Sequence, residues 1–101
     1  MVARIWHGRT SLEKSDEYYE FLRRRAAPDY RSVPGNRGVY LLREHRDDAA
    51  HFLTLTFWDS LEAIRGFAGD DLTRAKYYPE DKGFLLEFEE RVRHYEVRTG
   101  Q

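Results

Sequence analysis

The chain has 101 residues, which suffices for one domain and is too short for two ordinary hydrophobic cores. Its formal net charge of −1 provides no basic field for nucleic acid, and no apolar stretch is long enough for a signal peptide or a membrane span. The absence of cysteine excludes disulfides and thiolate metal sites and fits a reducing compartment, so we expect a single cytoplasmic domain over residues 1–101.

The N-terminal third predicts a strand followed by an amphipathic helix. Residues 2–9 (VARIWHGR) are rich in β-forming residues and alternate roughly in polarity. Thr10 then provides an N-cap, and Glu13 stands in the capping-box position three residues later. Apolar residues continue at helical spacing, so we expect a helix over residues 11–27 that ends near Pro28.

The middle of the chain predicts a β-hairpin and a second helix. Residues 37–45 (RGVYLLREH) and 50–58 (AHFLTLTFW) both have strand character, and the short polar stretch 46–48 between them favours a hairpin. Asp59 is expected to cap the next helix, and Gly69 is placed to end it.

A less regular stretch and a fourth strand complete the chain. The last strand is expected over residues 90–97 (ERVRHYEV). The resulting order, β-α-β-β-α-β, is the split βαβ arrangement of ferredoxin-like folds. We therefore predict an α+β fold in which two helices cover one face of a four-stranded antiparallel sheet.

The other face of this sheet needs a cover. Side-chain alternation divides the third strand into two sets: His51, Leu53, Leu55 and Phe57, and Phe52, Thr54, Thr56 and Trp58. We assign the first set to the helices because its centre is wholly aliphatic and aromatic. If the second face were exposed, its apolar patch would be larger than those of most soluble monomers. A second copy of the chain can cover it, because a two-fold interface needs only one self-complementary surface. The prediction is a homodimer through the open sheet face, enclosing a partly polar cavity.

The corner after the third strand, LTLTFWDSLEAIRGF, is similar to the strand-Trp-x-Ser-x-Glu-Ala-helix corner of the antibiotic biosynthesis monooxygenase (ABM-like) family. Trp58, Ser60, Glu62 and Ala63 hold these places, and the order of elements resembles the dimeric α+β barrel superfamily over nearly the whole chain. The resemblance implies a monooxygenase that acts on an electron-rich aromatic or polyphenol without metal, flavin or nicotinamide. Many members of the superfamily have no established activity, so the resemblance leaves open whether this chain is an enzyme.

Candidate site residues follow from the chemistry that such a reaction needs. A pocket that stabilises a phenolate needs aromatic walls, a donor for the oxyanion and a proton acceptor. The resemblance carries over Trp58 as a pocket wall. The catalytic candidates are His7, because an imidazole is the side chain suited to accept a proton near neutral pH, and Tyr40, which can donate a hydrogen bond. The candidates for substrate binding are Trp58, Arg4, Trp6 and Tyr77, the last in a stretch that could form a lid. Packing or ion pairing is the alternative role for each of these residues.

Two other functions are weighed against the monooxygenase. A non-catalytic binding or scaffold protein would keep the fold and the dimer. The resemblance also includes a heme-degrading branch, which uses an asparagine on the first strand, the corner tryptophan, present here as Trp58, and a histidine after the second helix. Here the first strand has no asparagine, and the place of that histidine is held by Ala75-Lys76. The four histidines show no metal-binding spacing, so we expect no metal site, and the resemblance implies that no cofactor is used.

Overall fold

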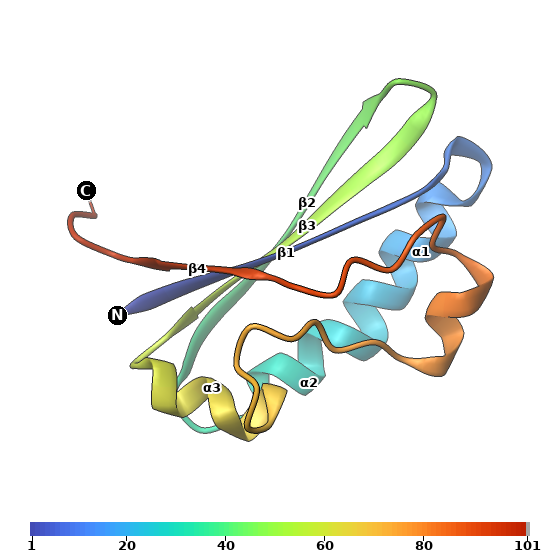
Figure 1. Ribbon diagram of the computed structural model, residues 1–101. Helices are drawn as coiled ribbons and strands as arrows, with labels where there is room; N and C mark the ends of the chain where they lie inside the picture. The colour runs from blue at the N-terminus through green and yellow to red at the C-terminus, as the bar shows by residue number, and fades with distance from the viewer. Residues whose placement is uncertain (101) are drawn as a thin grey trace.

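The computed structural model describes residues 1–100 and contains a four-stranded antiparallel sheet with helices on one face (Figure 1). Its strands follow the spatial order β2-β3-β1-β4. They are β1 (Val2–Ser11), β2 (Asn36–Arg46), β3 (Ala49–Trp58) and β4 (Arg93–Glu96). The predicted α+β, ferredoxin-like fold with its βαββαβ order is confirmed.

The first helical region is longer than predicted and changes its winding along the way. It consists of η1 (Leu12–Lys14), α1 (Ser15–Phe21), η2 (Leu22–Ala26) and α2 (Ala27–Arg31). The helix was expected to end near Pro28, and this boundary is wrong. A wider π-helical turn, η2, precedes Pro28, and this adjustment accommodates a ring that would clash with the carbonyl one turn earlier. The expected Thr10–Glu13 capping box is also absent, because β1 continues to Ser11 and Thr10 bonds the Ser11 carbonyl.

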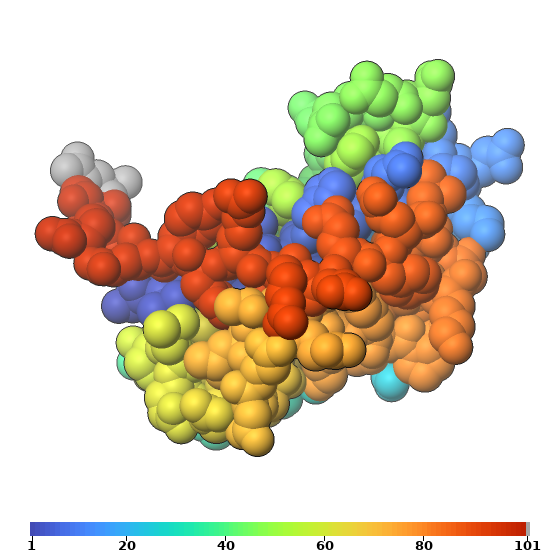
Figure 2. Space-filling model, viewed as in Figure 1, coloured from blue at the N-terminus to red at the C-terminus, as the bar shows by residue number. Residues whose placement is uncertain are grey.

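The predicted hairpin joins β2 and β3 through a two-residue turn. Asp47 and Asp48 both have positive φ, 51° and 58°, as a type I′ turn requires. The turn matches the twist of the flanking strands, and the hairpin projects from the rest of the molecule (Figures 1 and 2). Each strand is therefore slightly longer than the sequence pattern indicated.

The helix α3 (Leu61–Ala68) begins one residue later than expected. Ser60, not Asp59, is its N-cap, because the Ser60 hydroxyl accepts a hydrogen bond from the Ala63 amide at 3.2 Å. The Asp59 carboxylate instead binds Arg37. Gly69 ends the helix with φ at 82°, as predicted.

After α3 a crossing segment, residues 69–85, runs over the helices, and the segment before β4, residues 86–92, leads from it to the sheet. The crossing segment contains the short helix η3 (Pro79–Gly83), and isolated bridges connect Thr10 with Leu85 and Arg74 with Arg91. In Figure 2 these two segments, coloured orange to red, form a layer beside β1. The fourth strand is shorter than the predicted 90–97 because the residues before Arg93 bond the crossing segment instead of β1.

The two faces of β3 are the reverse of the prediction. Phe52, Thr54, Thr56 and Trp58 are buried under the helices, each at most 2% exposed. The threonines were expected outside a dry core, but Thr56 Oγ1 accepts a hydrogen bond from Trp58 Nε1 at 2.8 Å and donates to the Arg4 carbonyl. This internal pairing removes the cost of burying the hydroxyl. The residues on the other side define the open sheet face: Ile5, His7, Tyr40, Leu42, His51, Leu53, Leu55 and Phe57.

No helix in the described part of the chain, residues 1–100, has the length and apolar character needed to cross a membrane.

Candidate functional site

A small chamber lies between the sheet and the helices, and we call it the inner chamber. Strands β1 and β3, the first helical region and the crossing segment all contribute to its lining. The lining residues are Trp6, Tyr18, Leu22, Ala26, Tyr30, Thr54, Lys76, Tyr78 and Asp81. Its free volume is about 10 Å³, which is room for about one water molecule.

Trp6 lies in this chamber because Gly8 leaves space for its indole. The two residues are on the same face of β1, and a Cβ at Gly8 would meet the Trp6 Cη2 atom at 2.4 Å. The Trp6 side chain is buried, and its Nε1–H forms no hydrogen bond of good geometry with the described residues, although the side chain lies close enough to Tyr77 to oppose the burial that raises the pKa of that phenol. An unpaired buried donor costs about 1–3 kcal/mol, so a ligand oxygen at this position would remove a real penalty.

Asp81 provides a buried carboxylate to the same chamber. It is 2% exposed, and its two oxygens accept hydrogen bonds from the Tyr18 hydroxyl at 2.8 Å and the Tyr78 amide at 2.7 Å. The second of these bonds belongs to the capping box of η3. Burial raises the pKa of Asp81, although both hydrogen bonds oppose the rise. The carboxylate is therefore a stronger proton acceptor than an exposed aspartate.

Lys76 and Tyr78 form the wall between the inner chamber and the outside. Both bind the same oxygen of Asp29, Lys76 Nζ at 3.1 Å and the Tyr78 hydroxyl at 2.5 Å. The same two side chains, with Arg25 and Asp29, line an outer hollow of about 380 Å³. Lys76 and Tyr78 thus line both the inner chamber and the outer hollow.

Arg4 is buried beside the chamber but serves the fold. Its guanidinium donates to the carbonyls of Leu72 at 2.6 Å and Arg74 at 3.1 Å, which ties the crossing segment to β1. It lies 5.6 Å from the Phe67 ring centroid and forms no ion pair with a carboxylate in the described residues. Burial lowers the pKa of Arg4, and the nearby Tyr30 opposes this shift.

The other two candidates for substrate binding lie outside the inner chamber. Trp58 is fully buried, and its ring centroid lies 6.2 Å from that of Phe67. Phe67 in turn stacks on the chamber residue Tyr30, with the two ring centroids 4.1 Å apart. Tyr77 packs edge-on against Trp6, and its hydroxyl donates to the Glu89 carbonyl at 2.5 Å. Of the four candidates, Trp6 alone lines the chamber, and Trp58 supports its wall from behind.

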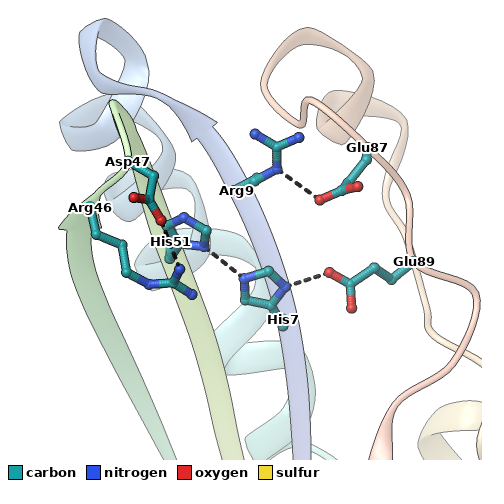
Figure 3. Close-up of polar contacts among 7 residues, drawn as sticks. All are labelled: His7, Arg9, Arg46, Asp47, His51, Glu87 and Glu89. Atoms are coloured by element: carbon teal, nitrogen blue, oxygen red, sulfur yellow. Dashed lines mark hydrogen bonds and ion pairs between the residues drawn. The ribbon is translucent and has the colours of Figure 1, made fainter.

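The two catalytic candidates lie on the opposite face of the sheet. His7 contacts Glu89 and His51 there (Figure 3), and Tyr40 packs edge-on against Phe57 while remaining 58% exposed. The sheet separates both side chains from the inner chamber. They therefore cannot act on a molecule bound beside Trp6 in the same subunit.

Asp81 and Lys76 line the chamber but were not among the predicted site residues; Lys76 was noted only at the place of the histidine of the heme-degrading branch. The pattern Tyr78-Pro79-Glu80-Asp81 carries a signal, since proline at the first helical turn with an acidic residue at the third position indicates a helix start. The Tyr18–Asp81 contact spans 63 residues and depends on how the crossing segment packs on α1.

A model of the antibiotic biosynthesis monooxygenase family matches residues 1–75. The chain belongs to this family. Among solved structures, a MhuD mutant with two manganese protoporphyrin IX molecules bound per active site is similar, with a TM-score of 0.64 and 20% sequence identity. The alignment covers 100% of this chain and 98% of the MhuD chain, and at this identity the likeness shows the fold alone. No curated protein matches the sequence significantly.

The ABM match ends just before the outer wall of the inner chamber. It includes Trp6, Tyr18 and Tyr30, whereas Lys76 and Asp81 follow it in the chain. The polar groups most suited to proton transfer in this chamber thus lie beyond the part of the sequence that the family model describes.

Proposed function

We propose that this ABM-family chain is a cofactor-independent monooxygenase for an electron-rich aromatic or polyphenolic small molecule. The observation that carries the proposal is that the lining of one aromatic chamber contains both a tryptophan whose Nε1–H is unsatisfied and a buried carboxylate. Trp6 Nε1 is the donor and the Asp81 carboxylate is the acceptor. These are the two groups that deprotonation of a bound phenol requires.

The chemistry assigned to the chamber begins with a proton transfer. Asp81 accepts the phenol proton, and the phenolate oxygen accepts the Trp6 Nε1–H. The ammonium of Lys76 in the chamber wall adds attraction for the anion. The electron-rich ring then reacts with dioxygen at an activated CH₂ carbon, so that CH₂ and O₂ give C=O and H₂O. The substrate supplies all four electrons, and no external reductant is needed.

Substrate entry requires the chamber to open. Its free volume of about 10 Å³ is far below that of a phenolic ring, whereas the outer hollow beyond Lys76 and Tyr78 measures about 380 Å³. We assign this wall as the entrance. Both of its side chains are held by Asp29, Lys76 through an exposed contact and Tyr78 through a half-buried one, and neither contact involves the sheet, so the wall opens without disrupting it.

A non-catalytic binding or scaffold protein is the second candidate, and the near-filled chamber favours it. In that case Asp81 and Tyr18 are simply a buried hydrogen-bonded pair that holds η3 on α1. A porphyrin ligand does not fit the chamber, because none of its lining residues is a histidine and the amine of Lys76 is a poor iron ligand at neutral pH.

We also propose that two copies pair through the open sheet face. Tyr40, Leu42 and Leu53 are 58%, 43% and 37% exposed on it. Three strands of about ten residues and the four-residue β4, about 4.8 Å apart, present roughly 550 Å² per copy, or about 1,100 Å² in total, which is near the lower limit for a specific interface. Basic and acidic side chains are interspersed around this face, so a second copy meets both signs.

Oxygen uptake tests the proposed activity. The metal-stripped protein is given a panel of anthrones, naphthols and hydroquinones, beside the variants Trp6→Phe and Asp81→Asn and the matched control Asp70→Asn, an exposed aspartate. We expect uptake above the buffer rate that falls at least about tenfold in the two chamber variants and persists in the control. Circular dichroism verifies that each variant is folded.

Ligand binding separates the two candidate functions. If the folded protein takes up no oxygen but a naphthol raises its melting temperature, and Trp6→Phe removes that effect, the binding protein is the correct assignment. If the panel neither reacts nor binds, the inner chamber is a packed core without a ligand.

A further inference from the structure

The open sheet face carries a hydrogen-bonded chain of three titratable side chains, shown in Figure 3. His7 Nδ1 contacts the Glu89 carboxylate, and His7 Nε2 lies 3.0 Å from His51 Nδ1. The two imidazole rings stack with their centroids 5.2 Å apart. The three residues come from β1, β3 and the segment before β4, so their hydrogen bonds form only in the folded sheet.

Each hydrogen bond needs one donor and one acceptor, and this requirement fixes which ring nitrogens of the three-residue network carry a proton. With Glu89 ionised, His7 donates from Nδ1, and a neutral His7 therefore accepts at Nε2. His51 must then donate from Nδ1, which leaves its free lone pair on Nε2. One added proton enters at His51 Nε2 and shifts along the chain, so both hydrogen bonds persist and Glu89 offsets the charge.

A second added proton has no such accommodation. It places N–H groups on both of the facing atoms, His7 Nε2 and His51 Nδ1, and their hydrogen bond is lost. Two positively charged rings then lie in contact, and the single Glu89 carboxylate offsets only one of the two charges. The chain therefore tolerates one added proton and resists two.

The charged groups around the pair do not relieve this restriction. Every neighbouring strand or segment contributes some: Arg9 from β1, Arg43, Glu44 and Arg46 from β2, Asp47 from the turn, and Glu87 from the segment before β4. The Glu87 carboxylate is bound to Arg9 at 2.8 Å, and Glu44 is bound to Arg46 at 2.7 Å. Burial, followed by the charges of Arg46 and His7, lowers the pKa of His51.

We propose that the Glu89–His7–His51 chain makes the pairing of two copies through the open sheet face depend on pH. The inference rests on the pairing proposed above. The histidines line a hollow of about 310 Å³ together with Leu42 and Leu53, two of the exposed apolar residues of that face. A second copy on the face removes the water that solvates a doubly protonated pair, so pairing holds near neutral pH and weakens in acid.

Sedimentation velocity across about pH 5 to pH 8 tests the inference on wild-type protein, His51→Gln and the control His45→Gln. Glutamine at position 51 can still donate to His7 but cannot become charged. His45 is also at the hairpin end of the sheet, and its ring binds Ser15 Oγ at 2.8 Å. In wild type and His45→Gln we expect the dimer dissociation constant to be at least about tenfold larger at about pH 5 than at neutral pH. In His51→Gln we expect the dissociation constant to be the same at both pH values.

Nitrogen NMR provides a readout that does not depend on assembly. Neutral His51 is expected as the Nδ1–H tautomer, and an Nε2–H tautomer would contradict the proton assignment. If copies pair at neutral pH but the affinity does not change in acid, or if His51→Gln keeps the wild-type dependence, this inference fails while the pairing stands. A monomer at every pH overturns both. Oxygen uptake by His51→Gln is expected at the wild-type level, because the inner chamber lies on the other side of the sheet.

Discussion

The indole of Trp6 occupies the space that a side chain at position 8 would need. Both residues are on the helix side of β1, and the ring extends over the Gly8 backbone toward Leu85. Glycine is required here for close packing and not for its backbone freedom, since Gly8 has no positive φ. The unsatisfied Trp6 Nε1 of the inner chamber is thus held in place by a residue without a side chain.

Gly8→Ala is expected to destabilise the protein by about 1–3 kcal/mol, because the new methyl group overlaps the indole and forces it out of its position. Urea unfolding followed by tryptophan fluorescence measures the change. Gly83→Ala is the control, because a Cβ there meets no atom within 4 Å. Equal stability of the two variants would show that the indole moves aside freely.

At the scale of the element, η3 owes its position to Asp81, which caps its backbone and accepts the Tyr18 hydroxyl of α1. Burial raises the pKa of Asp81 above its value in the unfolded chain, so the folded protein binds the proton more tightly. The stabilisation that comes from protonating Asp81 is fully present below the pKa that Asp81 has in the unfolded chain, and it declines as the pH rises through the higher pKa that Asp81 has in the folded protein.

The free energy of unfolding of wild type relative to Asp81→Asn is therefore expected to fall as the pH rises from about 3.5 through the acidic range. Denaturant titrations of both proteins at several pH values measure this difference. A difference that grows with pH would mean that the hydrogen bonds to the carboxylate outweigh its burial and that its pKa is lowered.

The β2–β3 turn contains a second element-scale test. Asp48 has a φ of 58°, a left-handed conformation that costs less for glycine than for aspartate. We expect Asp48→Gly to stabilise the fold by about 0.5 kcal/mol, because the relieved strain exceeds the added freedom of the unfolded chain. A melting temperature at or below that of wild type would contradict this balance.

At the scale of the whole molecule, the sheet has one face for each proposed property. The helix side carries the inner chamber, and the open sheet face carries the pairing surface with its histidine chain. Changes on one face should leave the other intact, because the strands between them are held by a continuous antiparallel ladder.

Leu53→Lys is accordingly expected to make the protein monomeric without unfolding it, since a charge would be buried at the centre of the pairing surface. Leu86→Lys is the matched control, an exposed leucine on the segment before β4. Light scattering gives the mass, and circular dichroism gives the fold. A Leu53→Lys protein that remains dimeric would place the interface elsewhere.

The sequence alone determined the order of elements, because local signals mark the turns between them, while the exact ends of the first helical region, α3 and β4 differ from the prediction. Asp47-Asp48 between two alternating runs indicates a hairpin, and Gly69 after an apolar stripe indicates a helix end. The Trp58–Ala63 corner identified the family that the match over residues 1–75 then showed. The inner surface of the sheet was not determined in this way, since alternation says which residues share a face and not which face meets the helices.

Tertiary structure decided that question and, with it, the composition of both candidate sites. Thr56 is internal because Trp58 Nε1 supplies its hydrogen bond, and Trp6 is internal because Gly8 makes room for it. His7 and His51 meet only through the offset pairing of β1 with β3, and Asp81 reaches Tyr18 only because the crossing segment covers α1. These contacts join residues far apart in the chain, and their energies depend on packing that no local pattern encodes.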